Sequence, residues 1–171
     1  MEYTNQKQMS DFSLPRLKEI PAANRRAVMN DEWEKVATEE MMDAVENAEN
    51  KWMRCLPLLQ GKIKNETEIR KRAKEWSELI STIIFSFHHD VIAIAQAKNV
   101  DTQSLKKSTW NCVKTLKEWS KAIESEKDLD ELQELVRFGI EFLKNHEMGP
   151  EDALYELRLA AAREVKERTG I

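Results

Sequence analysis

The sequence predicts an all-α fold: a single-domain, up-and-down bundle of about five helices with an N-terminal arm. The chain of 171 residues contains only 4 glycines and 4 prolines, too few for an all-β protein with many tight turns. Charged residues make up 34% of the chain, which suits long amphipathic helices with solvent-facing sides. This length allows one core that folds without disulfides or structural metals.

Residues 1–24 are predicted to form the arm, and residues 25–171 the helical domain. Pro15 and Pro21 exclude a long helix within the arm, because proline interrupts helical hydrogen bonding. The N-terminus lacks the basic and apolar segments of a signal peptide, and no apolar run approaches the roughly 20 residues of a membrane span. We therefore expect a cytoplasmic protein with no membrane segment.

Two long helices are predicted to follow the arm. The first is capped by Asn30 or Asp31 and ends within residues 57–61. The second starts after a capping box formed by Asn65 and Glu68, in which each residue binds the backbone of the other. Apolar residues lie on two faces of this second helix. It is therefore expected to be the central helix, covered on two sides.

Three further helices are predicted after the central one. The third is capped by Asp101 or Thr102 and runs to about Glu124, and the fourth starts at a cap formed by Asp128. A Gly-Pro pair at residues 149–150 separates the fourth helix from the last. Short connections favour antiparallel neighbours. The core is expected to include Trp76, Ile80, Ile83, Phe87, Val91, Leu116, Val136 and Leu143.

The net charge of −4 excludes a global basic field that would attract the protein to nucleic acid or to an anionic membrane. Any contact with a polyanion must therefore be a local patch. The two cysteines, Cys55 and Cys112, both lie among apolar neighbours on predicted helices. We expect buried free thiols at both positions, as in a reducing compartment.

The central helix carries two adjacent histidines and an aspartate, His88, His89 and Asp90. This run is similar to the His-Asp doublet of HD-type phosphohydrolases, which binds a divalent metal together with a histidine well upstream. The only other histidine here is His146, downstream of the doublet. Neighbouring helical residues point about 100° apart, so the three side chains cannot converge on one ion. We expect partly buried, hydrogen-bonded histidines and no metal at any of the three.

Carboxylates on two predicted helices form a second pattern. The run EEMMD (residues 39–43) resembles the EExxE element of all-α nucleoside triphosphate pyrophosphohydrolases of the MazG type, in which a later helix supplies ExxD. The resemblance implies that Glu40 and Asp43 bind magnesium, with Glu78 as the first acid of the second pair. In those enzymes magnesium activates water against a nucleotide phosphate. The second element reads ELIS (residues 78–81), with a hydroxyl where the family has an acid.

The third helix predicts a basic face. Four lysines and a tryptophan fall within an arc of roughly 80°, well away from the apolar residues. Lysines contact phosphates and an exposed indole stacks on bases, a pairing typical of grooves for single-stranded nucleic acid. Solvation of the lysines, or burial of the tryptophan against a subunit, is the alternative. The candidate set, extended by basic residues of the central helix, is Lys106, Trp110, Lys114, Lys117, Lys121, Arg70, Lys71 and Lys74.

These observations predict a non-catalytic helical subunit that acts by self-association or within a larger protein complex. Five tryptophans and wide apolar faces favour association, since tryptophan is enriched at interfaces. The expected partner is a second copy of the chain or another protein, with single-stranded RNA or DNA as a candidate partner of the lysine and tryptophan face, and no cofactor is expected. The alternative is a magnesium-dependent nucleoside triphosphate pyrophosphohydrolase. A second acidic pair opposite Glu40 and Asp43 would distinguish the two functions.

Overall fold

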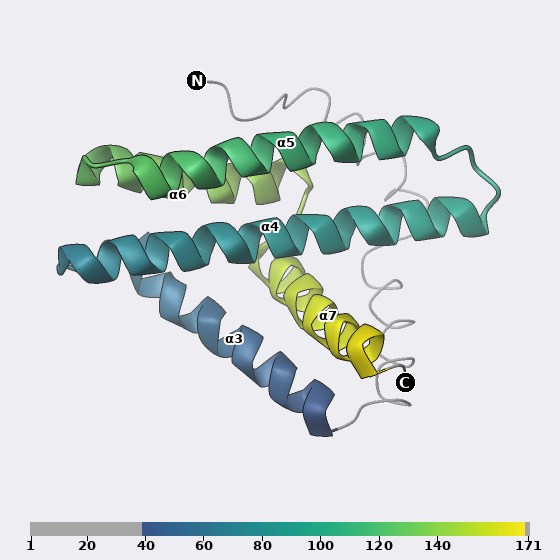
Figure 1. Cartoon of the computed structure of the whole chain (residues 1–171), viewed down its shortest axis with the longest axis horizontal. Helices are drawn as coiled ribbons and strands as arrows, with labels where there is room; N and C mark the ends of the chain where they lie inside the picture. The colour runs from purple at the N-terminus through teal and green to yellow at the C-terminus, as the bar shows by residue number, and fades with distance from the viewer. Residues whose placement is uncertain (1–38, 170–171) are drawn as a thin grey trace.

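The structure, a computed structural model, describes residues 39–169, and this part of the chain is all-helical with no strand (Figure 1). Helices cover 86% of it, which confirms the predicted fold class. The arm of residues 1–24 and the caps expected at Asn30 or Asp31 lie outside the described residues. In chain order the helices are α3 (Glu39–Leu59), α4 (Glu66–Ala97), α5 (Gln103–Ser125), α6 (Leu129–Asn145) and α7 (Pro150–Thr169).

Helix α4 is the centre of the bundle. It contacts each of the other four described helices, and its 32 residues make it the longest of them. Helices α3 and α7 pack against each other on one side of α4, and α5 and α6 pack together on the other side (Figure 1). This arrangement explains why α4 carries apolar residues on two faces. Most candidate site residues lie on α4 or on a helix that contacts it.

The helix starts follow the predicted capping residues. The Asn65 side chain accepts a hydrogen bond from the backbone N–H of Glu68 at 3.1 Å. Asp128 accepts hydrogen bonds from two backbone N–H groups of α6, including that of Glu131 at 3.1 Å. Thr102 is the N-cap residue of α5 without a side-chain bond, and Asp101 instead accepts from a backbone N–H in the first turn. Local sequence therefore sets where these three helices begin.

Tryptophans fill much of the core. Trp76 of α4 and Trp119 of α5 are fully buried, and their indole N–H groups donate to backbone carbonyls of α6, Val136 at 2.8 Å and Leu135 at 2.7 Å. Trp52 of α3 is also buried. These three rings pack inside the described part of the chain and are not available to an interface. All predicted core residues are buried: Trp76, Ile80, Ile83, Phe87, Val91, Leu116, Val136 and Leu143.

One described helix, α4, is long and apolar enough to cross a membrane. Its most apolar window has a mean hydropathy of 1.3, and 56% of that window is buried inside the bundle. Length and composition alone do not distinguish a membrane span from the core helix of a soluble protein. The burial on both sides of α4 accounts for its apolar character.

Candidate functional site

A groove of about 490 Å³ lies between α3, α4 and α7. Carboxylates from all three helices line it: Glu40 and Asp43 of α3, Glu75 and Glu78 of α4, and Glu164 of α7. The three acids that the MazG-type resemblance implies as ligands therefore line the same groove. These acids lie together because α3 packs against α4, and this packing cannot be read from the sequence.

Helical spacing explains how the acids reach the groove. Glu40 and Asp43 are three residues apart, as are Glu75 and Glu78, and side chains at this spacing share a helix face. Ser81, at the position of the family's second acid, is not among the lining residues, whereas Glu75 is. The second acidic pair thus runs from Glu78 toward the start of α4. The three-residue spacing of Glu75 and Glu78 can be read from the sequence, but the family pattern places its second acid at position 81 instead.

The groove also contains basic and small side chains. Lys51 and Arg168 line it, and Arg168 donates a hydrogen bond to the carboxylate of Glu40. The site is therefore acidic overall, with two cations placed among five carboxylates. Small side chains of α3 and α7 leave the groove open between the charged groups: Ala44, Ala48, Ala160 and Ala161.

The donor set of the groove fits a hydrated cation better than a closed cage. Glu75 Oε2 is buried and accepts no hydrogen bond, although guanidinium nitrogens of Arg72 and Arg54 lie 3.5 and 3.6 Å away. The groove carboxylates do not form a group of three with ligand atoms within 4.8 Å of one another in residues 39–169. Magnesium keeps several waters and takes one or two carboxylates together with phosphates, so it tolerates this wider spacing.

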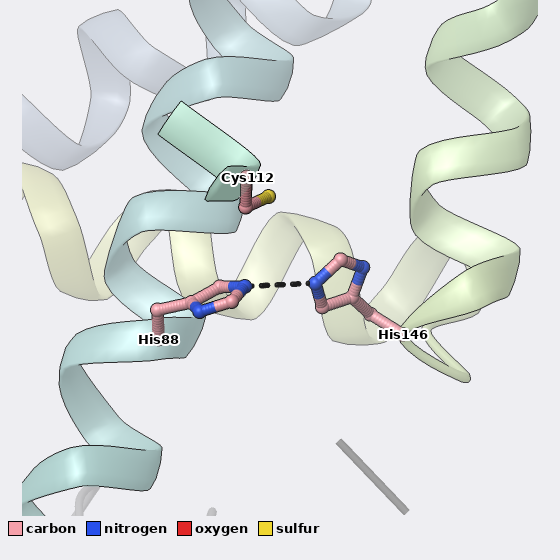
Figure 2. A group of neighbouring side chains, drawn as sticks. All are labelled: His88, Cys112 and His146. Carbon is pink, nitrogen blue, oxygen red and sulfur yellow. Dashed lines mark hydrogen bonds between the residues drawn. The ribbon is translucent and has the colours of Figure 1, made fainter. Parts of the chain in front are cut away.

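The side chains of His88, His89 and Asp90 lie outside the groove and point in different directions, as the sequence predicts. His88 is 1% exposed and faces α5 and α6, His89 points to solvent, and Asp90 is buried against α7. His88 Nε2 lies 2.9 Å from Nε2 of His146, the C-cap residue of α6 (Figure 2). Both rings are fully rather than partly buried. The sequence did not predict this pairing, because His146 is 58 residues away.

Cys112 of α5 lies beside the histidine pair, and burial controls the protonation of all three groups. Burial, aided by the neighbouring His146, lowers the pKa of His88 to about 3. Burial lowers the pKa of His146 to about 4, opposed in part by its hydrogen bond to the Phe142 carbonyl. Burial raises the pKa of the Cys112 thiol to about 12. Around neutral pH the two rings and the thiol are therefore uncharged.

A second buried polar network connects α4 to α7. Arg163 forms an ion pair with Asp90 and donates to the Ser86 hydroxyl at 3.1 Å. Ser86 in turn donates to Glu156 at 2.9 Å, and Asp90 and Glu156 are at most 1% exposed. These contacts hold together two of the three helices that line the groove. No motif in the sequence points to Arg163 or Glu156.

The predicted basic face of α5 is exposed to solvent. Trp110 is 57% exposed, and the Lys114 ammonium lies 5.7 Å from the centroid of its ring, a cation–π distance. The indole is therefore not buried against a neighbouring helix of the described chain. Four lysines of the candidate set share this exposed character: Lys106, Lys114, Lys117 and Lys121.

Arg70, a candidate from the central helix, lies at the start of α4. Its guanidinium donates to the backbone carbonyls of Glu126 at 2.6 Å and Lys127 at 2.7 Å, in the connection between α5 and α6. Arg70 therefore ties the start of α4 to this loop. Lys71 and Lys74 are exposed.

Comparison of the chain with models of protein families, with curated proteins and with solved structures found no match.

Proposed function

We propose that the groove between α3, α4 and α7 binds a nucleoside triphosphate with magnesium and hydrolyses it to the monophosphate and pyrophosphate. One observation carries this proposal: Glu75 and Glu78 line the same groove as Glu40 and Asp43. An acidic pair in this position is the feature that separates the hydrolase from a non-catalytic subunit.

The size and charge of the groove support a nucleotide. A volume of about 490 Å³ lies within the usual range of small-molecule sites. Lys51 and Arg168 supply cations for phosphate oxygens, while the carboxylates hold the metal. Bound magnesium would neutralise phosphate charge and activate water. Arg168 already pairs with Glu40, so it is placed to exchange this carboxylate for a phosphate when the nucleotide enters.

The test is release of pyrophosphate from each nucleoside triphosphate, in ribose and deoxyribose form, with magnesium. We expect Glu40→Gln and Glu78→Gln each to reduce the rate by about 100-fold or more, because each removes a charge from the metal site while keeping its shape. Glu118→Gln, a matched change at an exposed position of α5, should leave the rate unchanged.

Two results would refute the proposal. One is the absence of pyrophosphate release from every triphosphate tested with magnesium or manganese. The other is release that persists in Glu40→Gln and Glu78→Gln, since it would come from another site or a contaminant. Urea unfolding of the variants separates loss of activity from loss of the fold.

The second candidate function is a subunit that associates and contacts single-stranded nucleic acid through the α5 face. The exposed Trp110 ring, with Lys114 at 5.7 Å, favours it, since an aromatic ring beside lysines suits base stacking and phosphate contact. The face consists of Lys106, Trp110, Lys114, Lys117 and Lys121, and it is called the α5 face below.

A further inference from the structure

Three potential metal ligands from separate parts of the chain converge inside the bundle. His88 comes from α4, Cys112 from α5, and His146 from the end of α6, and each is at most 2% exposed. Their ligand atoms all lie within 4.8 Å of one another. In Figure 2 the two imidazole rings face each other, and the Cys112 sulfur lies above the line that joins them. The cluster lies toward α5 and α6, apart from the groove.

The hydrogen bond of His146 fixes its tautomer. Its Nδ1 lies 2.8 Å from the Phe142 carbonyl oxygen, which only accepts, so Nδ1 carries the proton. In the neutral ring Nε2 then presents a lone pair. Histidines that bind metals commonly donate their other N–H to a carbonyl in this way. The His146 ring is thus oriented as a ligand.

The hydrogen bond between Thr109 and His88 is compatible with either tautomer of the His88 ring. Its hydroxyl oxygen lies 2.9 Å from His88 Nδ1 and 2.9 Å from the Leu105 carbonyl oxygen, and it has a single proton to donate. If that proton goes to Leu105, the hydroxyl accepts from His88 Nδ1–H, and His88 Nε2 presents a lone pair. The lone pairs of both Nε2 atoms then point into the space between the rings.

The same residues also satisfy the cluster without an ion. If Thr109 donates to His88 Nδ1, then His88 Nε2–H donates to Nε2 of His146, and His146 Nδ1–H donates to Phe142. This chain of neutral hydrogen bonds matches the observed distances. Rotation of the Thr109 hydroxyl and a tautomer change of His88 convert one state into the other. In the first state the ion is the partner of both Nε2 lone pairs, whereas in the second state hydrogen bonds satisfy all four ring nitrogens.

We propose that His88, Cys112 and His146 bind one d¹⁰ transition-metal ion, Zn²⁺ or Cu⁺, and that Thr109 acts as the positioning residue for His88. Two imidazoles and one thiolate are the donors that these borderline and soft ions prefer. On binding, the Cys112 sulfur forms a bond to the metal and its proton leaves to solvent. The ion then connects α4, α5 and α6.

The distances suit such an ion after small movements. Metal–nitrogen bonds of about 2.0–2.1 Å and metal–sulfur bonds of about 2.3 Å keep tetrahedral ligands roughly 3.3–3.7 Å apart. The nitrogens at 2.9 Å need to separate by a few tenths of an ångström, while all ligand atoms are already within 4.8 Å. This proposal departs from the sequence-based expectation of no metal at His88 and His146, because the sequence does not show that His146 and Cys112 lie beside His88.

The experiment uses Co²⁺ as a spectroscopic probe on the full chain. The protein is unfolded in reductant and chelator, then refolded with Co²⁺ after the chelator is removed, because the cluster is enclosed. We expect one Co²⁺ per chain, held by the three side chains with water as the fourth ligand, with visible bands of tetrahedral cobalt and a near-ultraviolet sulfur-to-cobalt charge-transfer band. Addition of Zn²⁺ should abolish the bands. A separate titration with Cu⁺ against a chromophoric chelator distinguishes the two ions.

Matched variants assign the ligands. Cys112→Ser should remove the charge-transfer band, and His88→Gln or His146→Gln should weaken cobalt binding by about 10-fold or more. Cys55→Ser and His89→Gln are the controls, since Cys55 is a buried thiol outside the cluster and His89 is the exposed neighbour of His88. Both controls should bind cobalt as the wild type does.

Several outcomes would overturn the proposal. They are the absence of a charge-transfer band in the wild type with no stoichiometric Zn²⁺ or Cu⁺ binding, or retention of the band in Cys112→Ser. The wild-type band reports the thiolate directly, so the test does not depend on the folding of any variant. Thr109→Val tests the positioning role: it should weaken metal binding, while Thr109→Ser should restore it.

Discussion

At the scale of single residues, Gly139 shows how a missing side chain sets the distance between two helices. It lies in α6, where the indole of Trp76 crosses from α4 and donates to the Val136 carbonyl at 2.8 Å. A Cβ atom at position 139 would lie 2.4 Å from Trp76 Nε1 and 2.8 Å from Cε2. These distances are too short for non-bonded atoms. The hydrogen bond of Trp76 therefore depends on glycine.

Gly139→Ala is expected to destabilise the protein. Alanine improves helix propensity by up to about 1 kcal/mol, but overpacking against a buried indole costs about 1–3 kcal/mol. The net loss is measured by urea unfolding. The control is Gly149→Ala, because an added Cβ there meets nothing within 4 Å and should change stability little. An increase in stability for Gly139→Ala would show that α4 and α6 separate without cost.

At the scale of helices, α4 places different polar side chains on its two buried sides. His88 and Asp90 are two residues apart, so their side chains point about 200° apart around the helix. His88 meets His146 on the side of α6, and Asp90 meets Arg163 on the side of α7. A helix buried on both sides thus places one polar cluster in each half of the bundle.

Helix α5 gives a prediction of its own. If the α5 face binds a phosphate backbone, affinity for single-stranded RNA or DNA should fall with salt, with a log–log slope near −0.7 per phosphate contact. Reversal of Lys114 and Lys117 to glutamate should flatten this slope. Trp110→Ala should weaken binding by about 1–3 kcal/mol without changing the slope, since stacking releases no counterions.

A salt titration of binding for the wild type and these variants is the measurement, with Lys166→Glu on α7 as the control. Absence of binding at about 50 mM salt would exclude the nucleic-acid contact. A change in oligomeric state on Trp110→Ala, without a lysine effect, would identify the α5 face as a protein interface instead.

At the scale of the molecule, each half of the bundle contains one buried cysteine, whose reactivity shows when that half unfolds. Cys55 of α3 lies in the half formed with α7, where its thiol is 3.8 Å from the Arg72 carbonyl oxygen. Cys112 of α5 lies in the half formed with α6. Burial raises the pKa of each thiol to about 12. Because the thiolate is the reactive form, neither should be alkylated in the folded protein near pH 8.

Alkylation with iodoacetamide across a urea gradient, in chelator at pH 8, tests whether the halves unfold together. We expect both thiols to become reactive over the same urea range as helix is lost by circular dichroism, because α4 belongs to both halves and a domain of this size usually unfolds as one unit. Mass spectrometry assigns each label. Earlier alkylation of Cys55 alone would show that α3 and α7 open independently.

The sequence by itself determined the all-α class, the helix starts at Asn65 and Asp128, the buried positions of α4 and the exposure of the α5 lysines. These features depend on side chains within a few residues of one another, through caps and helical periodicity. Only the tertiary structure decided that Glu75 joins Glu78 in the groove and that His88 meets His146 and Cys112. It also placed Trp76 and Trp119 in the core rather than at an interface. Such contacts depend on the rotation and crossing of helices far apart in the chain, which local sequence does not specify.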